Sequence, residues 1–294
     1  MPNHVTSVIN LSGDENRIKS MLEAIKNDEY GIGSVDFNKI LPMPDNIYRG
    51  DLGPAERAEY GRNNWYDWHL ANWGTKWNCY GYENGIEMEA GKLKFLTAWS
   101  APHPILQKLS EMYPDIKFEH EWADEDIGNN CGRYVYYDGE RIEEYFPGSQ
   151  KDCLEFAAKV MDVSLEEEYS IYLNAAETGY INIEDGEYEL IEVAEHTALF
   201  TNERITDADI PKGMYCYHLR HNDDAEFFAI EKTVAVNHAG SIVTKEPIDL
   251  KSKGYIVLDE DNSPNFLGEN MSLYMFREYD PGQTEELSMG MQEV

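Results

Sequence analysis

Residues 92–122, KLKFLTAWSAPHPILQKLSEMYPDIKFEHEW, hold the pattern that decides the fold of the first half of the chain. Residues 92–100 alternate two sets of side chains, as a β-strand does. A short helix follows, opened by prolines and closed at Pro114. Its apolar residues share one face: Ile105, Leu106, Leu109 and Met112. Residues 116–122 alternate again, so the stretch predicts a strand, a helix and a second strand.

A similar unit precedes this one. Residues 4–11 have the β-branched content of a strand, and the next residues place Ile18, Met21, Leu22 and Ile25 on one helical face. Residues 34–44, SVDFNKILPMP, alternate as a strand ended by Pro42. The order β-α-β, insertion, β-α-β predicts an α+β fold, a ferredoxin-like split βαβ sandwich with an antiparallel sheet. Residues 131–146 add a hairpin turning at Asp138-Gly139, and residues 149–163 a closing helix.

The insertion is rich in tryptophan. Four of the six tryptophans of the chain lie in residues 63–82, NNWYDWHLANWGTKWNCYGY. We expect one helix from Pro54 to near Gly74, followed by a strand that carries Trp77. Packing against the sheet accounts for this composition, so the predicted aromatic core is Trp65, Trp68, Trp73, Trp77 and Trp99. A stacking platform for a ligand is the alternative. The cations near it, Arg57, Arg62 and Lys76, are offset by Glu56, Glu59 and Asp67, so no basic track runs along it.

The charge of the chain restricts its partners. It has 24 Lys and Arg against 56 Asp and Glu, a net charge of −32. Such a surface repels nucleic acid and anionic membranes, so we expect neither as a direct partner. A protein is the expected partner, and a basic one if the chain acts as a decoy for a DNA-binding protein. Duplex DNA carries one negative charge per roughly 1.7 Å, so the 32 net negative charges, arranged in a stripe, would imitate about 54 Å of duplex. The alternative is that the carboxylates only keep the protein soluble.

One acidic group stands out in the first domain. It consists of Glu119, Glu121, Asp124, Glu125 and Asp126. These residues form either a solvated strand end or an interaction surface that holds a divalent ion or meets a basic partner.

Sequence motifs for cofactors and metals are absent. The four cysteines lie far apart without a CxxC pair, which indicates reduced thiols. No GxGxxG, P-loop, HExxH or GxSxG occurs, and the calcium-like stretch 259–270 has Pro264 where glycine is required. No cofactor or metal is therefore expected. The chain also has no apolar run of about 18 residues and no secretory start, which predicts a cytoplasmic protein.

The second half of the chain has a different pattern, with few helical periods. Short β-like runs separated by turns predict a small strand-rich domain over residues 187–279, after an acidic linker at 164–186 and before a tail at 280–294. Its polar residues form a candidate ligand site: Arg220, Asp223, Asp224, Asn237 and His238. A cation, carboxylates and an imidazole would suit acid–base chemistry or ligand binding if the predicted turns 220–224 and 237–240 meet. The alternative is that these residues only shape the turns.

Two resemblances add a biological setting. The runs NWYDWHLANWGTKWN, LKFLTAWSAP and LQKLSEMYPDIKFEHEWADEDIG resemble the ferredoxin-like domain of YubB and Api92-like proteins of conjugative plasmids and phages, over residues 1–163. The runs ALFTNERI, IPKGMYCYHLRHNDD and VAVNHAGSIVTKEPI are similar to a large-polyvalent-protein-associated domain of integrative elements, often from gut Firmicutes. The resemblances imply a fold and a mobile-element setting, and they supply no catalytic residues.

Together these observations predict a non-enzymatic accessory protein of a plasmid, phage or integrative element. It would act by protein–protein interaction, in the sharpest version as an acidic decoy for a DNA-binding protein. One alternative is a small-ligand binder or enzyme that uses Arg220, Asp223, Asp224 and His238. Another is a structural module of a conjugation or replication assembly.

Overall fold

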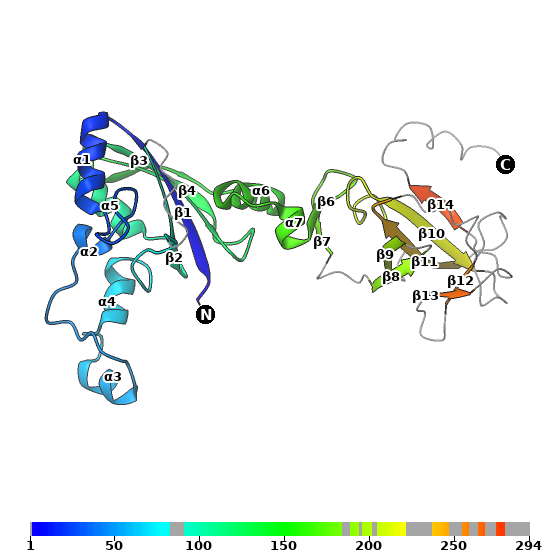
Figure 1. Ribbon diagram of the computed structural model, residues 1–294, viewed down its shortest axis with the longest axis horizontal. Coiled ribbons are helices and arrows are strands. Elements are labelled where there is room, and N and C mark those ends of the chain that lie inside the picture. The colour runs from blue at the N-terminus through cyan, green and yellow to red at the C-terminus, as the bar shows by residue number, and fades with distance from the viewer. Residues whose placement is uncertain are drawn as a thin grey trace. The chain divides into compact units, whose positions relative to one another are not determined.

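A computed structural model describes residues 2–82, 91–183, 189–193, 196–201, 205–221, 237–246, 255–258, 264–267 and 275–279. The chain separates into two compact units, residues 1–163 (unit 1) and residues 164–294 (unit 2). Both contain antiparallel sheets, and unit 1 also contains six of the seven described helices, so the fold is α+β (Figure 1).

Unit 1 is built on a five-stranded antiparallel sheet in the order β2-β1-β3-β4-β5. The strands are β1 (His4–Ser12), β2 (Lys92–Ala98), β3 (Lys117–Asp124), β4 (Gly132–Tyr137) and β5 (Glu140–Tyr145). Strands β2 and β3 are both antiparallel to β1, which lies between them. They are joined by helix α5 (His103–Met112), which makes residues 92–124 a split βαβ unit. The predicted fold class is confirmed.

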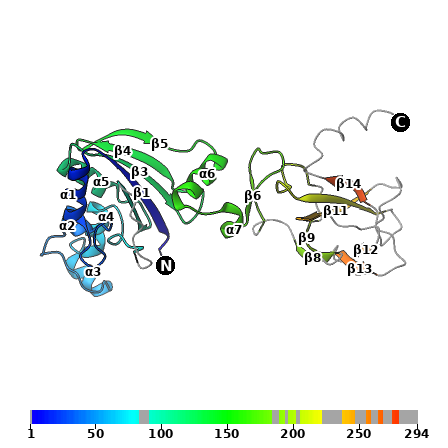
Figure 2. The same cartoon turned by 45° about the horizontal axis from the view of Figure 1, so that its top comes forward.

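Helices cover both faces of this sheet. Helix α1 (Glu15–Ile25) and α5 pack on the face that presents Ile9 and Phe118. Helix α6 (Gln150–Met161) packs on the opposite face, against Val8 and Ala123. Figure 2 shows α1 and α5 on one side of the sheet and α6 on the other. Strands β1 and β3 are therefore shielded from water on both faces of the sheet.

The two predicted helices that begin with acidic or hydroxyl caps are present. The Asp14 carboxylate accepts the backbone N–H groups of Asn16 and Arg17, each at 3.0 Å, which starts α1. Ser149 accepts the N–H of Asp152 at 3.1 Å and starts α6. The apolar stripe predicted for α1 is buried in full: Ile18, Met21, Leu22 and Ile25.

The strand predicted at residues 34–44 is wrong. These residues form the short helix α2 (Phe37–Ile40), whose first turn is capped by the Asp36 carboxylate accepting the N–H of Asn38 at 3.0 Å. Phe37 and Ile40 are both buried, at the i, i+3 spacing of one helical face. The fold therefore contains one split βαβ unit, and the N-terminal strand and helix are followed by more helix.

The single helix predicted for the insertion is also wrong, because it is two helices. Helix α3 (Pro54–Tyr60) ends at Gly61, whose φ of 55° lies in the left-handed region. Helix α4 (Trp65–Asn72) begins at Asn64, whose side chain accepts the N–H of Asp67 at 3.0 Å. The glycine and the new cap divide the segment.

Only part of the predicted aromatic core is core. Trp73 is 1% exposed, lies against Phe37 with ring centroids 5.7 Å apart, and donates its indole N–H to the Leu41 carbonyl at 2.9 Å. Trp65 and Trp68 are half-buried. Trp77 and Trp99 are 38% and 41% exposed, so their assignment to the core is wrong, and Trp77 lies in a bend before the bridge that Tyr80 makes with Leu96.

Unit 2 is strand-rich in its described residues. Its larger sheet has the order β14-β10-β11-β9-β8. The strands are β8 (Glu189–Val193), β9 (His196–Thr201), β10 (Tyr215–His221), β11 (Asn237–Thr244) and β14 (Met275–Tyr279). Strands β12 (Tyr255–Leu258) and β13 (Pro264–Leu267) form a separate pair.

The segment expected as a linker carries secondary structure. Residues 164–183 contain helix α7 (Leu165–Tyr169) and the paired strands β6 (Ile171–Leu173) and β7 (Tyr180–Asn182). Tyr172 and Ile183 pack against the apolar cluster of unit 2. These residues are thus part of unit 2, and the predicted tail at 280–294 lies outside the described residues.

The two tryptophan environments make a matched stability test. We expect Trp73→Ala to lower the free energy of unfolding by about 3–5 kcal/mol, because it empties a fully buried site. Trp77→Ala removes a side chain that is already exposed and should cost under about 1 kcal/mol. Urea unfolding followed by far-UV circular dichroism measures both, and equal losses would contradict this assignment of the core.

Candidate functional site

A partly exposed aromatic surface lies at the end of β2, beside the loop of residues 73–80 that follows α4. We define it as Arg57, Tyr66, Lys76, Trp77 and Trp99. The Lys76 Nζ lies 4.4 Å from the Trp77 ring centroid and 4.6 Å from that of Trp99. The Arg57 guanidinium carbon lies 5.4 Å from the Tyr66 ring centroid, and Tyr66 meets Trp99 edge-on at 6.2 Å. These distances are within the range of cation–π and aromatic pairing.

Trp99 is held in an unfavourable backbone conformation. Its φ is 72°, in the left-handed region, where a residue with a Cβ is strained by about 1–2 kcal/mol. Its backbone N–H donates to the Asn3 carbonyl at 2.9 Å. The Thr97 hydroxyl donates to the Ser100 carbonyl at 2.9 Å and bridges the bend. The surrounding hydrogen bonds therefore stabilise a conformation that projects an indole ring toward solvent.

The two loops of the aromatic surface are joined directly. The buried Thr75 hydroxyl donates to the Ala98 carbonyl at 2.8 Å and accepts the Ala98 N–H at 3.2 Å. The Ser100 hydroxyl donates to the Gly74 carbonyl. Residues 74–77 and 97–100 are thus one hydrogen-bonded assembly, so the spacing of Trp77 and Trp99 is set before any partner arrives.

Two histidines lie in an aromatic cluster inside unit 1. His120 on β3 is completely buried, with Nε2 3.0 Å from the Ser7 hydroxyl. His103, the first residue of α5, lies 5.5 Å from His120 between ring centroids, and 4.5 Å and 4.7 Å from Trp122 and Tyr134. The Nδ1 atoms of both histidines are buried without a hydrogen-bond partner among the described residues.

Burial keeps both imidazoles neutral. It lowers the pKa of His103 to about 4, with a smaller contribution from the Arg141 charge. Burial also lowers the pKa of His120 well below its usual value, and His103 adds to this. Within the described residues, no group of three or more His, Cys, Asp or Glu side chains could hold a metal ion. The pair therefore acts as a packed, uncharged part of the core.

The predicted acidic group on β3 is divided among separate partners. Glu119 pairs with Arg133 at 3.2 Å, and Glu121 pairs with Lys159 at 3.1 Å. Asp124 is buried and accepts side-chain amide hydrogens from Asn3 and Asn130 at 3.2 Å and 3.0 Å. Only Glu125 and Asp126 are exposed. Most of this group is therefore engaged within unit 1.

A second carboxylate group, unnoticed as a site in the sequence, lies on α7. Glu166, Glu167 and Glu168 are exposed, and none of them pairs with a Lys or Arg in the part of the chain that the structure describes. Glu168 accepts the Ser164 N–H at 3.2 Å, and Ser164 caps the helix. The favourable position of acidic residues in a first helical turn accounts for the helix, while the outer carboxylates stay open to solvent.

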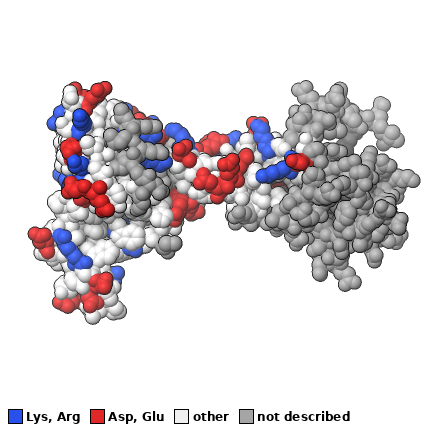
Figure 3. All heavy atoms as spheres, viewed as in Figure 1, with Lys and Arg blue, Asp and Glu red and all other residues white. Residues whose placement is uncertain are grey.

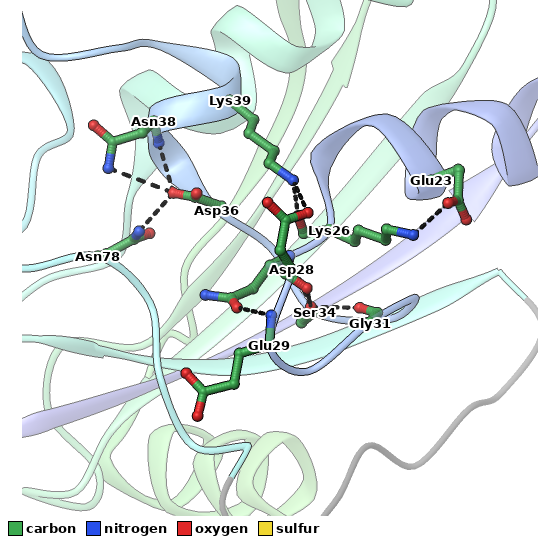
Figure 4. Close-up of polar contacts among 11 residues, drawn as sticks. Glu23, Lys26, Asp28, Glu29, Gly31, Ser34, Asp36, Asn38, Lys39 and Asn78 are labelled. Carbon is green, nitrogen blue, oxygen red and sulfur yellow. Dashed lines mark hydrogen bonds and ion pairs between the residues drawn. The ribbon is translucent and has the colours of Figure 1, made fainter.

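A polar network closes the loop between α1 and α2 (Figure 4). The Lys39 ammonium donates to the Lys26 carbonyl at 2.7 Å and to the Asp28 carboxylate at 2.6 Å. The Asp36 carboxylate accepts the Asn78 side-chain amide at 2.7 Å, which ties α2 to the loop beyond α4. The network therefore positions α2 and connects it to the loop that follows α4.

Strand pairing sets the backbone register of two residues of the candidate ligand site of unit 2, Arg220 and His238. The register of β10 and β11 makes Arg220 the cross-strand partner of His238, and His221 that of Asn237. Residues 237–240, predicted as a turn, are the start of β11, so that prediction is wrong. Asp223 and Asp224 lie outside the described residues. The proximity of Arg220 and His238 arises from strand pairing.

Two features of the aromatic surface could not be predicted from the sequence: the outward bend at Trp99 and the position of Lys76 between two rings. The motif TAWSAP indicates the family resemblance. The positive φ that turns Trp99 outward cannot be predicted from residue spacing. Lys76 was counted only as one charge among its neighbours. Its position between two rings depends on the pairing of the α4 loop with the end of β2.

Comparison with known proteins agrees with both resemblances. Residues 73–173 match the family model described as a ferredoxin-like domain in Api92-like protein. Residues 184–278 match the one described as large polyvalent protein associated domain 28. No curated protein and no solved structure matches the chain.

The two matches, in this order, indicate an accessory protein of the mobile-element type. The first matched range begins at Trp73 and includes β2 to β5, so it contains Lys76, Trp77 and Trp99. Among the described residues, no helix is both long and apolar enough to span a membrane.

The strain at Trp99 can be measured by replacing it. We expect Trp99→Gly to be more stable than Trp99→Ala by about 1 kcal/mol, because glycine adopts a φ of 72° without a Cβ clash. At Trp77, where φ is not positive, glycine should be no better than alanine. Thermal unfolding of the four variants provides the comparison, and an alanine variant as stable as the glycine variant at position 99 would contradict the strain.

Half-buried His103 and fully buried His120 predict a loss of stability in mild acid. Because the folded-state pKa of each lies below the unfolded value, the unfolded chain takes up protons first as the pH falls below about 6.5. The histidine contribution is thus complete above about pH 6.5 and decreases toward about pH 4. We expect His103→Gln to flatten the dependence of the urea midpoint on pH between 7 and 5. An unchanged slope would show that His103 is not buried as a neutral group.

Proposed function

We propose that the protein acts without catalysis, by binding a basic protein partner, and that the carboxylates of α7 and the residues after it form the contact. In its sharpest form this is a decoy that occupies the DNA-binding surface of another protein. The observation that carries the proposal is the set of exposed glutamates on α7, which form no ion pair with any Lys or Arg that the structure describes.

The distribution of charge along the chain supports this location. Residues 164–195 contain ten Asp and Glu and no Lys or Arg. Residues 1–163 have 28 acidic and 16 basic residues, whereas residues 164–294 have 28 acidic and 8 basic ones. On the face drawn in Figure 3, carboxylates gather over α7, while on unit 1 they alternate with Lys and Arg. An unbalanced negative field over unit 2 favours a cationic partner.

The pairing pattern of unit 1 supports the same choice. Its carboxylates on β3 already have partners in Arg133, Lys159 and the amides of Asn3 and Asn130. Recruiting them to a new partner would break these contacts. Among the described residues, the α7 glutamates have no ion pair to lose, and only Glu168 accepts a hydrogen bond, from the Ser164 N–H. A basic partner would therefore replace mainly water around them.

The proposal is tested by neutralising α7. We expect the wild-type protein to capture from host extract a basic nuclease, helicase or recombinase that added duplex DNA releases. Replacing Glu166, Glu167 and Glu168 together with Gln should reduce recovery about tenfold, with binding that weakens as salt is raised.

The matched control removes the same charge elsewhere. Replacing Glu140, Glu143 and Glu144, which are exposed on β5, with Gln should leave recovery close to that of the wild type. Recovery of ribosomal proteins alone, or equal losses in the two triple variants, would overturn the assignment to α7.

A further inference from the structure

We propose that the aromatic surface of unit 1 is a docking site for a partner-protein segment that carries a carboxylate next to an apolar side chain. This site is separate from α7 and has the opposite chemical preference. The juxtaposition of an exposed, strained Trp99 with Lys76 and Trp77 carries the inference.

Four of the five side chains of this surface are hydrogen-bond donors only, and the fifth, Tyr66, can both donate and accept. Lys, Arg and Trp side chains donate and do not accept. Neither the Lys76 ammonium nor the Arg57 guanidinium pairs with a carboxylate within the described residues, despite the large excess of acid in the chain. A surface of donors and aromatic rings is complementary to a segment that offers acceptors and apolar carbon.

The surface is also pre-formed. The Thr75–Ala98 hydrogen bonds join its two loops, and the bend at Trp99 is held by the Asn3 carbonyl. Fixing the rings before binding reduces the entropy lost on association. Tryptophan, tyrosine and arginine are the residues that dominate binding energies at protein interfaces. A backbone conformation that costs stability but exposes an indole is consistent with selection for such contact.

A protein segment suits this surface better than single-stranded nucleic acid. Stacking of bases on tryptophan would need a track of cations for the phosphates. Only Lys76 and Arg57 belong to the surface, and Glu56 and Glu59 lie on the same helix as Arg57. The net charge of −32 adds repulsion for a chain of phosphates, whereas a peptide with one or two carboxylates meets little of it.

The full-length protein and three synthetic probes test the proposal. The probes are a ten-residue peptide with Asp on both sides of a central Phe, the same peptide with Lys in place of Asp, and oligo(dT). We expect only the acidic peptide to shift the indole N–H resonances of Trp77 and Trp99 saturably. The affinity should fall at least about tenfold in Trp99→Gly, which keeps the bend, and several-fold in Lys76→Gln.

Ile142→Ala is the control, because Ile142 is exposed on β5, away from these residues in sequence and sheet position. It should bind the acidic peptide like the wild type. No resonance shift with millimolar acidic peptide, equal shifts with the Lys peptide, or preferential binding of oligo(dT) would each overturn the proposal. These outcomes leave the α7 test unaffected, because that test uses a basic partner and different variants.

Discussion

Strand β1 has to be buried on both faces, and the rest of unit 1 follows from that requirement. Ile9 and Val8, adjacent in sequence, point to opposite sides of the sheet and are 0% and 6% exposed. One side needs α1 and α5, and the other needs α6. Strands β2 and β3 satisfy the hydrogen bonds of β1 at its two edges, and their parallel relation requires the crossover helix α5. The split βαβ arrangement is the consequence.

The insertion between α1 and β2 serves this core at one end and the surface at the other. Trp73 and Phe37 extend the apolar cluster beneath α1 and α5. After Trp73 the chain leaves this cluster and returns to it with Cys79 and Tyr82. In between, the loop is bonded to the end of β2 through Thr75, which leaves Trp77 and Trp99 outside. The insertion thus completes the core with Trp73 and presents Trp77 to solvent, next to Trp99 from the end of β2. The two proposed interaction surfaces have different origins. The aromatic surface consists of residues left outside the core, and the α7 surface consists of carboxylates that pair with no described Lys or Arg.

Local pattern was sufficient where one face of an element is apolar. The stripe from Ile18 to Ile25 identified α1, and the alternation and prolines of residues 92–122 identified β2, α5 and β3. It failed at residues 34–44, where the alternation of residues 35–40 is also compatible with one helical turn at 37–40, and Asp36 as a cap selects the helix. It failed again at residues 54–74, because Gly61 and Asn64 were counted as helix interior.

The amino-acid sequence by itself determined the fold class, the excess of negative charge and the family resemblances, since these depend on composition, periodicity and short motifs. Tertiary structure alone decided which tryptophans are core, which carboxylates of β3 already have partners, and that Arg220 and His238 are opposite each other. The physical reason is that burial and ion pairing are set by contacts between residues distant in sequence. Lys76 and Trp99, or Glu121 and Lys159, meet only after the strands between them have paired.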